Sequence, residues 1–127
     1  MQKPVEIHFN NMDHSAALDE KIREHCEHLT RVCPQLHSCA VFMETIHRRK
    51  EGASPGDLYA VRIDMHVSGQ ELAVHHTQTD EEAHHEDAHQ AVQKTFRKAE
   101  KRLRSFLDKR KDKRLRGEKP ARAHVEE

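Results

Sequence analysis

Tryptophan is absent from this chain of 127 residues, and its remaining aromatic residues are one tyrosine and four phenylalanines. Glycine is also scarce, and its four copies form no phosphate-binding loop. No apolar stretch follows residues 1–5, so we expect neither a signal peptide nor a membrane-spanning segment. These absences argue against a P-loop enzyme, a secreted protein and a membrane protein.

The few cysteines argue against a disulfide framework. Cys26, Cys33 and Cys39 are odd in number and stand among apolar neighbours. Small secreted domains pair their cysteines, whereas cytosolic proteins keep buried thiols reduced. The pattern therefore predicts buried thiols and a cytoplasmic location. Cys26 adjoins His25, but adjacency alone does not activate a thiolate, so we interpret Cys26 as a packing residue.

The length and composition of the chain predict one small domain with a solvated part. Hydrophobic residues make up 35% of the chain and charged residues another 35%, which is a lean composition for a globular protein. We expect residues 1–116 to form the domain, a helix stop at Gly117, and a disordered tail over residues 117–127.

Hydrophobic periodicity predicts the secondary structure. Alternating or continuous apolar residues predict four strands, at Val5–Phe9, Cys39–Ile46, Leu58–Val67 and Glu71–His76. Apolar residues at spacings of three and four predict two helices, Ala16–Val32 with Ser15 as N-cap, and a final helix with an apolar stripe from Ala88 to Leu107. The charged segment 48–57 is expected to be a loop.

The order strand, helix, three strands, helix predicts an α+β fold. We expect a single β-α-β-β-β-α domain with a four-stranded sheet and both helices packed on one face. The other face of the sheet would carry polar groups such as Arg62, Asp64 and His66. The strand around Cys39–Ile46 is apolar throughout, so alternation does not assign its inward face.

Positive charge is concentrated at the final helix. Between Lys94 and Arg116 there are twelve Lys or Arg residues and three acids, although the whole chain has no net charge. The preceding run Asp80–Asp87 contains five acids and no Lys or Arg. Matching the helix dipole requires only a few charges at each end, so the excess favours binding to a polyanion. The chain is therefore predicted to bind nucleic acid through its last helix.

The expected contacts are with phosphate groups rather than with bases. No aromatic residue stands among the basic residues of the expected exposed face, because Phe96 and Phe106 belong to the apolar stripe. Helix phasing places most of the cations on one broad stripe, with Arg102 at its flank. The candidate RNA-binding residues are Lys94, Arg97, Lys98, Lys101, Arg102, Arg104, Lys109, Arg110 and Lys111.

Several segments together resemble a known family. The strand and turn Ile7-His8-Phe9-Asn10-Asn11 precede the helix start Ser15-Ala16-Ala17-Leu18, and a Val-containing hairpin follows. The final helix begins near Asp87, carries Ala91-Val92 and ends in the run Asp108-Lys109-Arg110-Lys111-Asp112-Lys113. Over about residues 5–113, this order resembles the ribosome hibernation factors, namely the short hibernation-promoting factor and ribosome-associated inhibitor A (S30AE, sigma-54 modulation) proteins.

The resemblance implies a fold like that of double-stranded-RNA-binding domains and a function without catalysis. Such proteins bind 16S rRNA of the small ribosomal subunit, in the channel for tRNA and mRNA, during stress or stationary phase. The resemblance implies no cofactor, no small-molecule substrate and no membrane partner. Two departures from the family are the histidines His25 and His28, where the first helix usually has lysines, and the longer, acidic stretch Thr77–Glu86. The long C-terminal extension of some family members is not expected.

Two alternative functions remain at this stage. The segment His85-Glu86-Asp87-Ala88-His89 has the H-E-x-x-H spacing of zinc proteases, in which one continuous helix presents both histidines. His75 or His76 would then supply a third ligand. Thirteen histidines make such a spacing probable by chance, and an acidic helix start is an unusual setting for it. The other alternative is a generic RNA-binding module without ribosome preference. Arg48-Arg49-Lys50 either extend the basic surface or simply solvate a loop.

Overall fold

The computed structural model describes residues 3–47 and 57–115. Along the chain, its elements are β1 (Glu6–Asn10), α1 (Ala16–Val32), β2 (Leu36–His47), β3 (Asp57–Val67), β4 (Gln70–Thr77), α2 (Asp80–His85) and α3 (Ala88–Leu115). This order confirms the predicted α+β fold and adds one short helix, α2. The predicted tail 117–127 and the basic residues Arg48-Arg49-Lys50 lie outside the described residues.

The boundaries of α1 are those that its sequence predicts. The Ser15 hydroxyl accepts a hydrogen bond from the Leu18 amide at 3.2 Å and so caps the first turn. Its apolar residues, at spacings of three and four, are all buried: Leu18, Ile22, Cys26 and Leu29. The helix ends before Pro34, where the Cys33 amide donates to the Leu29 carbonyl at 2.9 Å.

The strands form one four-stranded sheet in the order β1-β2-β3-β4. Strands β2, β3 and β4 form an antiparallel meander, whereas β1 pairs with β2 in parallel. This parallel pairing is possible because α1 carries the chain back between the two strands. The tight turn between β3 and β4 uses Ser68 at φ 50° and Gly69 at φ 76°, backbone angles that suit a two-residue hairpin.

The structure assigns the two faces of β2. Cys39, Val41 and Met43 point inward and are at most 2% exposed, whereas Phe42 lies between them on the outward face and is half-buried. Register with β3 accounts for this alternation, since Phe42 pairs with Arg62 and Val41 with Ile63. One phenylalanine therefore stands on the solvent face of the sheet, whereas Phe96 and Phe106 on the basic helix are buried, as predicted.

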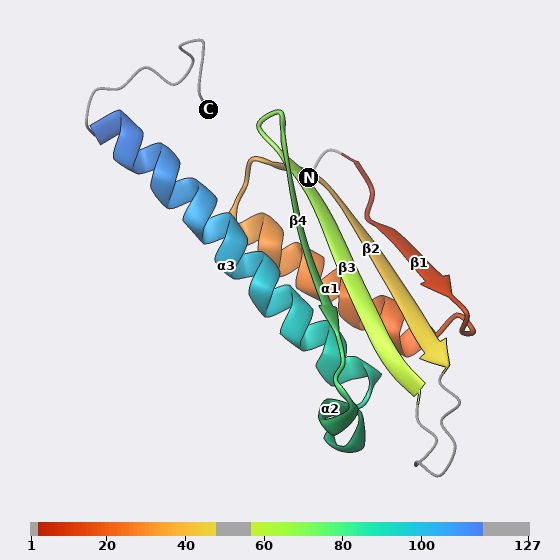
Figure 1. The fold of residues 1–127 in the computed structure, drawn as a ribbon. Coiled ribbons are helices and arrows are strands. Elements are labelled where there is room, and N and C mark those ends of the chain that lie inside the picture. Colours follow the sequence, from red (N-terminus) through yellow and green to blue (C-terminus); the bar gives the residue numbers. More distant parts are fainter. Residues whose placement is uncertain (1–2, 48–56, 116–127) are drawn as a thin grey trace.

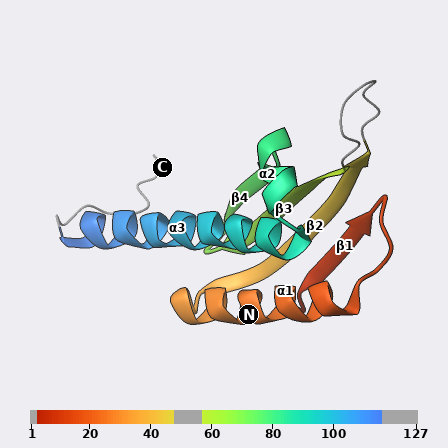
Figure 2. The same cartoon turned by 90° about the horizontal axis from the view of Figure 1, so that it is seen from below.

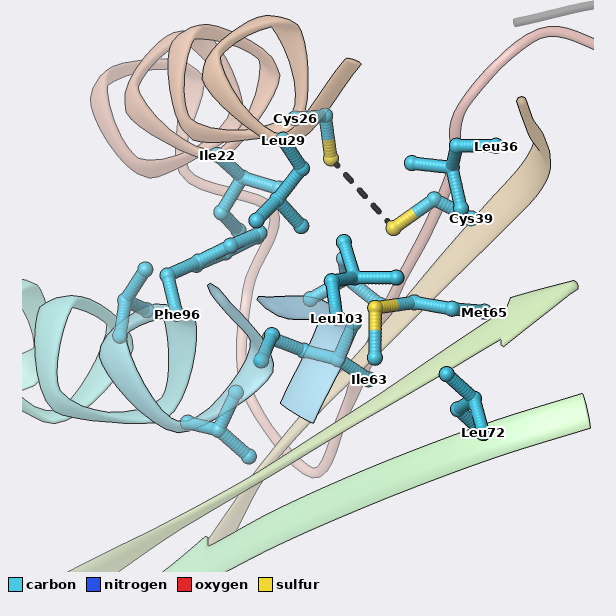
Figure 3. Close-up of a cluster of buried hydrophobic side chains, with 14 of the residues drawn as sticks. Ile22, Cys26, Leu29, Leu36, Cys39, Ile63, Met65, Leu72, Phe96 and Leu103 are labelled. Atoms are coloured by element: carbon cyan, nitrogen blue, oxygen red, sulfur yellow. Dashed lines mark hydrogen bonds between the residues drawn. The ribbon is translucent and has the colours of Figure 1, made fainter. Parts of the chain in front are cut away.

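Both long helices cover the same face of the sheet, as predicted (Figure 2). The core lies between the helices and the sheet and includes Ile22, Leu29, Ile63 and Leu103 (Figure 3). Within it, the Cys26 thiol donates to Cys39 Sγ at 3.7 Å. That hydrogen bond, together with burial, raises the pKa of Cys26. The prediction of buried thiols is therefore confirmed, since all three cysteines are free and buried.

The acidic segment forms a helix separate from the basic one. Thr79 and Glu82 make a reciprocal capping box at the start of α2. After the extended residue Glu86, Asp87 and Gln90 bond reciprocally at the start of α3, with both distances 3.0 Å. Each helix therefore has its own start signal, and residues 86–87 interrupt the helix that H-E-x-x-H chemistry requires.

Helix α3 projects beyond the core. Its apolar stripe is buried from Ala91 through Phe106, and Leu107 is partly buried against the core. The helix continues to Leu115, and Figure 1 shows its C-terminal end extending past the neighbouring strands and α1. Lys109, Arg110 and Lys111, which follow Leu107, are exposed on this part of the helix.

Candidate nucleic-acid interface

The exposed cations of α3 lie along two adjacent lines on the helix. Arg97, Lys101, Arg104 and Lys111 follow spacings of four, three and seven and form the outer ridge. Lys98, Arg102 and Lys109 are spaced by four and seven and form a second line beside it, the flank. All of these side chains are exposed. Arg102 therefore flanks the main stripe, as the helix phasing predicts.

These cations differ in how far other side chains compensate their charge. Arg104 donates through Nε and Nη2 to Glu100 Oε2, at 2.9 and 2.7 Å. Arg110 lies over the Phe106 ring at 5.6 Å. Within residues 3–47 and 57–115, no hydrogen bond or ion pair is made by the side chains of Arg97, Lys101, Arg102, Lys109 and Lys111. These unpaired cations are the ones available to an anionic ligand.

Lys94 is the most compensated of the predicted contacts. Its Nζ lies 3.0 Å from Glu82 Oε2 and also forms an ion pair with Glu86. Hydrogen bonds to Glu86 and Glu82 raise the pKa of Lys94. The pKa of Glu82 falls to about 2, first through the Thr79 backbone N–H and then through Lys94. The acidic helix α2 thus neutralises the first cation of α3.

Lys98 contacts the end of β4 rather than an acid. Its ammonium donates to the His75 carbonyl at 3.2 Å and lies 3.2 Å from His76 Nδ1. Because an ammonium can only donate, His76 Nδ1 must be the acceptor. Neutral His76 then carries its proton on Nε2, which is buried without a hydrogen-bond partner, 3.3 Å from Glu82 Oε1.

This proton arrangement bears on a possible metal site. The ligand atoms of His76, Glu82 and Glu86 all lie within 4.8 Å of one another. A metal ion would need Nε2 of His76 to be unprotonated, whereas the Lys98 ammonium at Nδ1 favours the form with the proton on Nε2. In addition, Lys94 already bridges the carboxylates of Glu82 and Glu86. We therefore interpret Glu82, Glu86 and Lys94 as an ion-pair network that joins α2 to α3 beside His76 of β4.

The zinc-protease geometry is wrong for this chain. His85 is the last residue of α2, and His89 lies in the first turn of α3, so the two histidines do not share one helix face. Glu86 between them is engaged, since Lys94 binds its carboxylate and Gln78 Nε2 donates to Oε1 at 3.3 Å. The continuous helix that the motif needs is replaced by two capped helices.

The two histidines of α1 have different surroundings. The His25 ring stacks on Phe96 at a centroid distance of 4.8 Å, and burial, followed by the charge of Lys21, lowers its pKa. His28 is half exposed, and its Nε2 lies 2.9 Å from Glu100 Oε1. Arg104 first, and His28 second, lower the pKa of Glu100. His28, Glu100 and Arg104 thus link α1 to the outer ridge.

A shallow groove runs between α1 and α3 beside this link. One hollow of about 300 Å³ is lined by residues that include His25, Phe96, Arg97 and Glu100. A second hollow of about 370 Å³ continues the groove, and both share His25 and Gln93. The α1 helix itself is not basic, because it carries Asp19, Glu20, Glu24 and Glu27 beside Lys21, Arg23 and Arg31. The cationic surface of the described residues is therefore largely confined to α3.

Comparison with known proteins identifies the family. Residues 5–111 match the sequence profile described as Sigma 54 modulation protein / S30EA ribosomal protein. The chain belongs to this family. No curated protein sequence matches the chain. The match covers every described strand and most of α3, so the family assignment applies to the whole fold, including the outer ridge and the flank.

Solved structures share this fold at low sequence identity. A ribosomal subunit interface protein from Coxiella burnetii is 15% identical, with a TM-score of 0.60 over 82% of this chain and 97% of that one. The N-terminal domain of Thermus thermophilus Protein Y is 13% identical, with a TM-score of 0.56 over 84% of this chain and 99% of that one. These similarities confirm the α+β fold. No helix among residues 3–47 and 57–115 is long and apolar enough to cross a membrane.

The sequence missed the residues that compensate the basic helix. Glu82, Glu86 and Gln78 hold Lys94 or its partners, and none of them was predicted to compensate the basic helix. A partial signal was present, because Thr79 and Glu82 have the spacing of a capping box, as do Asp87 and Gln90. Two such signals eight residues apart indicate two helix starts, and hence an acidic helix that can fold back on the basic one.

Proposed function

We propose that the protein binds the small ribosomal subunit through 16S rRNA, in the channel for tRNA and mRNA, and silences translation under stress or in stationary phase. The observation that carries this proposal is the set of unpaired cations on an exposed, projecting helix of a chain from the S30EA ribosomal protein family. Phosphate contacts fix position and orientation without reading sequence, which suits a protein that blocks a channel.

The shape of α3 suits a deep anionic groove. Its 28 residues correspond to about 42 Å of helix, of which the part after Phe106 projects by roughly 13 Å. The outer ridge and the flank present cations along this length, while the buried stripe fixes the helix on the sheet. Inhibition then requires only that the protein occupy the site of tRNA and mRNA, so the mechanism has no catalytic step.

Sedimentation with ribosomes tests the proposal. Tag-free protein is mixed with 30S subunits or 70S ribosomes and separated on sucrose gradients at several salt concentrations. We expect co-sedimentation with both, and at least a tenfold loss of affinity when Lys101→Glu and Arg102→Glu are combined. Lys3→Glu is the control, an exposed charge reversal before β1, at the opposite edge of the sheet from β4, against which α3 packs. Equal binding of an unrelated structured RNA would indicate a generic RNA-binding module instead.

A further inference from the structure

The outward face of the sheet carries a row of planar side chains across all four strands. Register pairs His8 with Phe42, Phe42 with Arg62, and Arg62 with His75. The His8 and Phe42 rings stack at a centroid distance of 4.8 Å and an interplanar angle of 8°. The positions on either side of the row include the small residues Ala40, Ala60 and Ala73.

The row is accessible. The side chains of His8 and Arg62 are 48% and 60% exposed, and Phe42 is half-buried on the same face. Both long helices, α1 and α3, lie on the opposite face (Figure 2). The stack covers one face of each ring, but His8 lies on the edge strand β1 and is largely exposed, so its outer side remains available for another planar group to stack on.

The charge around this row is negative. Register and alternation place Glu6, Glu44, Asp64 and Glu71 on the outward face. Among the outward positions of the described strands, Arg62 is the single Lys or Arg, and its Nε donates to Asp64 Oδ1 at 2.8 Å. The face therefore repels phosphate groups and attracts cations, which is the opposite of the outer ridge on α3.

We propose that the outward sheet face binds an arginine-rich, extended segment of a protein partner. A guanidinium group is planar, stacks on aromatic faces and pairs with carboxylates, so it matches both the His8–Phe42 stack and the surrounding acids. Lysine matches the charge but not the planar stacking. Because this face and α3 lie on different sides of the protein, the segment binds whether or not α3 holds RNA, and the proposal does not rest on ribosome binding.

Fluorescence anisotropy with labelled peptides tests this proposal on the full-length protein. The probe is a peptide of Arg-Gly-Gly repeats, compared with the same number of Lys-Gly-Gly repeats and with a short oligouridylate. We expect the arginine peptide to bind more tightly than the lysine peptide. Phe42→Leu keeps an apolar side chain but removes the ring, and it should weaken the arginine peptide about two- to fivefold.

Variants that change the charge of the sheet face provide a second test, which does not depend on whether Phe42→Leu disturbs the packing around residue 42. Glu6→Lys combined with Glu44→Lys should weaken the arginine peptide about tenfold or more, because each change replaces attraction by repulsion. Glu27→Lys, an exposed acid on α1, is the matched control, and the combined Lys101→Glu and Arg102→Glu variant should also bind the peptide normally. Equal affinity for arginine and lysine peptides, or an unchanged affinity in the double sheet variant, would overturn the proposal. Oligouridylate binding that Phe42→Leu weakens would show that the face binds nucleic acid instead.

Discussion

His28 is one of two histidines that stand where the family usually has lysine, and it is the one that can be replaced without disturbing the core. It is half exposed and faces Glu100, so a lysine there keeps that contact and adds a permanent cation beside the outer ridge. His25 offers no such test, because its ring is packed on Phe96 and burial lowers its pKa. A lysine at position 25 would place a charge against an apolar ring and disturb the core.

We expect His28→Lys to tighten ribosome binding at pH 7.5 by up to about fivefold, the usual range of one exposed ion pair. Ribosome binding of the variant and the wild type at pH 7.5, measured at several salt concentrations, checks this effect. An unchanged affinity would mean that α1 does not contact RNA.

At the scale of elements, α2 contributes to acid sensitivity through Glu82. The folded protein lowers the pKa of this carboxyl from 4.5 to about 2, through the Thr79 backbone N–H and then Lys94. A carboxyl whose pKa is lower when folded stabilises the protein above its unfolded pKa and loses that contribution as the pH falls through the folded value. The stabilisation should therefore be complete above about pH 4.5 and disappear as the pH approaches 2.

Glu82→Gln should consequently unfold at lower urea concentration than the wild type at pH 7, with the difference shrinking between pH 4.5 and 2. Glutamine still completes the capping box, so the change isolates the charge. Glu81→Gln, an exposed neighbour in the same first turn, is the control and should give no such pH-dependent difference. Urea titrations at several pH values measure the effect, which a constant difference down to pH 2 would contradict.

The ion-pair network also sets the availability of Lys94 to RNA. Glu86→Gln removes one of the two carboxylates that compensate this ammonium. We therefore expect ribosome binding to be unchanged or tightened up to about fivefold, as for one exposed charge. A hydrolase built on H-E-x-x-H would instead lose all activity with this substitution. Gradient sedimentation and translation assays of the variant distinguish the two outcomes, with Glu81→Gln again as the control.

Most elements were predictable because a single face of each one is buried. The stripes of α1 and α3 and the alternation of β3 match the burial that the structure shows. The outward position of Phe42 was not predictable, since β2 is apolar on both faces and only its register with β3 decides the side. The compensation of Lys94 was not predictable either, because it depends on how α2 folds back, a tertiary contact without periodicity.

At the scale of the whole molecule, a chain without net charge separates its charges between surfaces. The outer ridge and the flank of α3 are cationic, whereas the outward sheet face and α2 are acidic. Local field, not net charge, then determines what each surface attracts. The affinity for ribosomes should accordingly depend on the unpaired cations of α3 and little on Lys94, whose charge Glu82 and Glu86 already compensate.

The difference between the unpaired cations of α3 and the paired Lys94 predicts how ribosome affinity depends on salt concentration. Each phosphate contact lowers the slope of log affinity against log salt by roughly 0.7 to 0.9, so about five contacts cost on the order of a few hundredfold between 50 and 200 mM. Lys101→Gln should make the slope shallower by about one contact, because Lys101 has no partner among the described residues. Lys94→Gln should change it much less. Binding measured over this salt range compares the two variants. Equal slopes for both would mean that the ion pairs of Lys94 break on binding, and a flat wild-type response would remove α3 as the main contact.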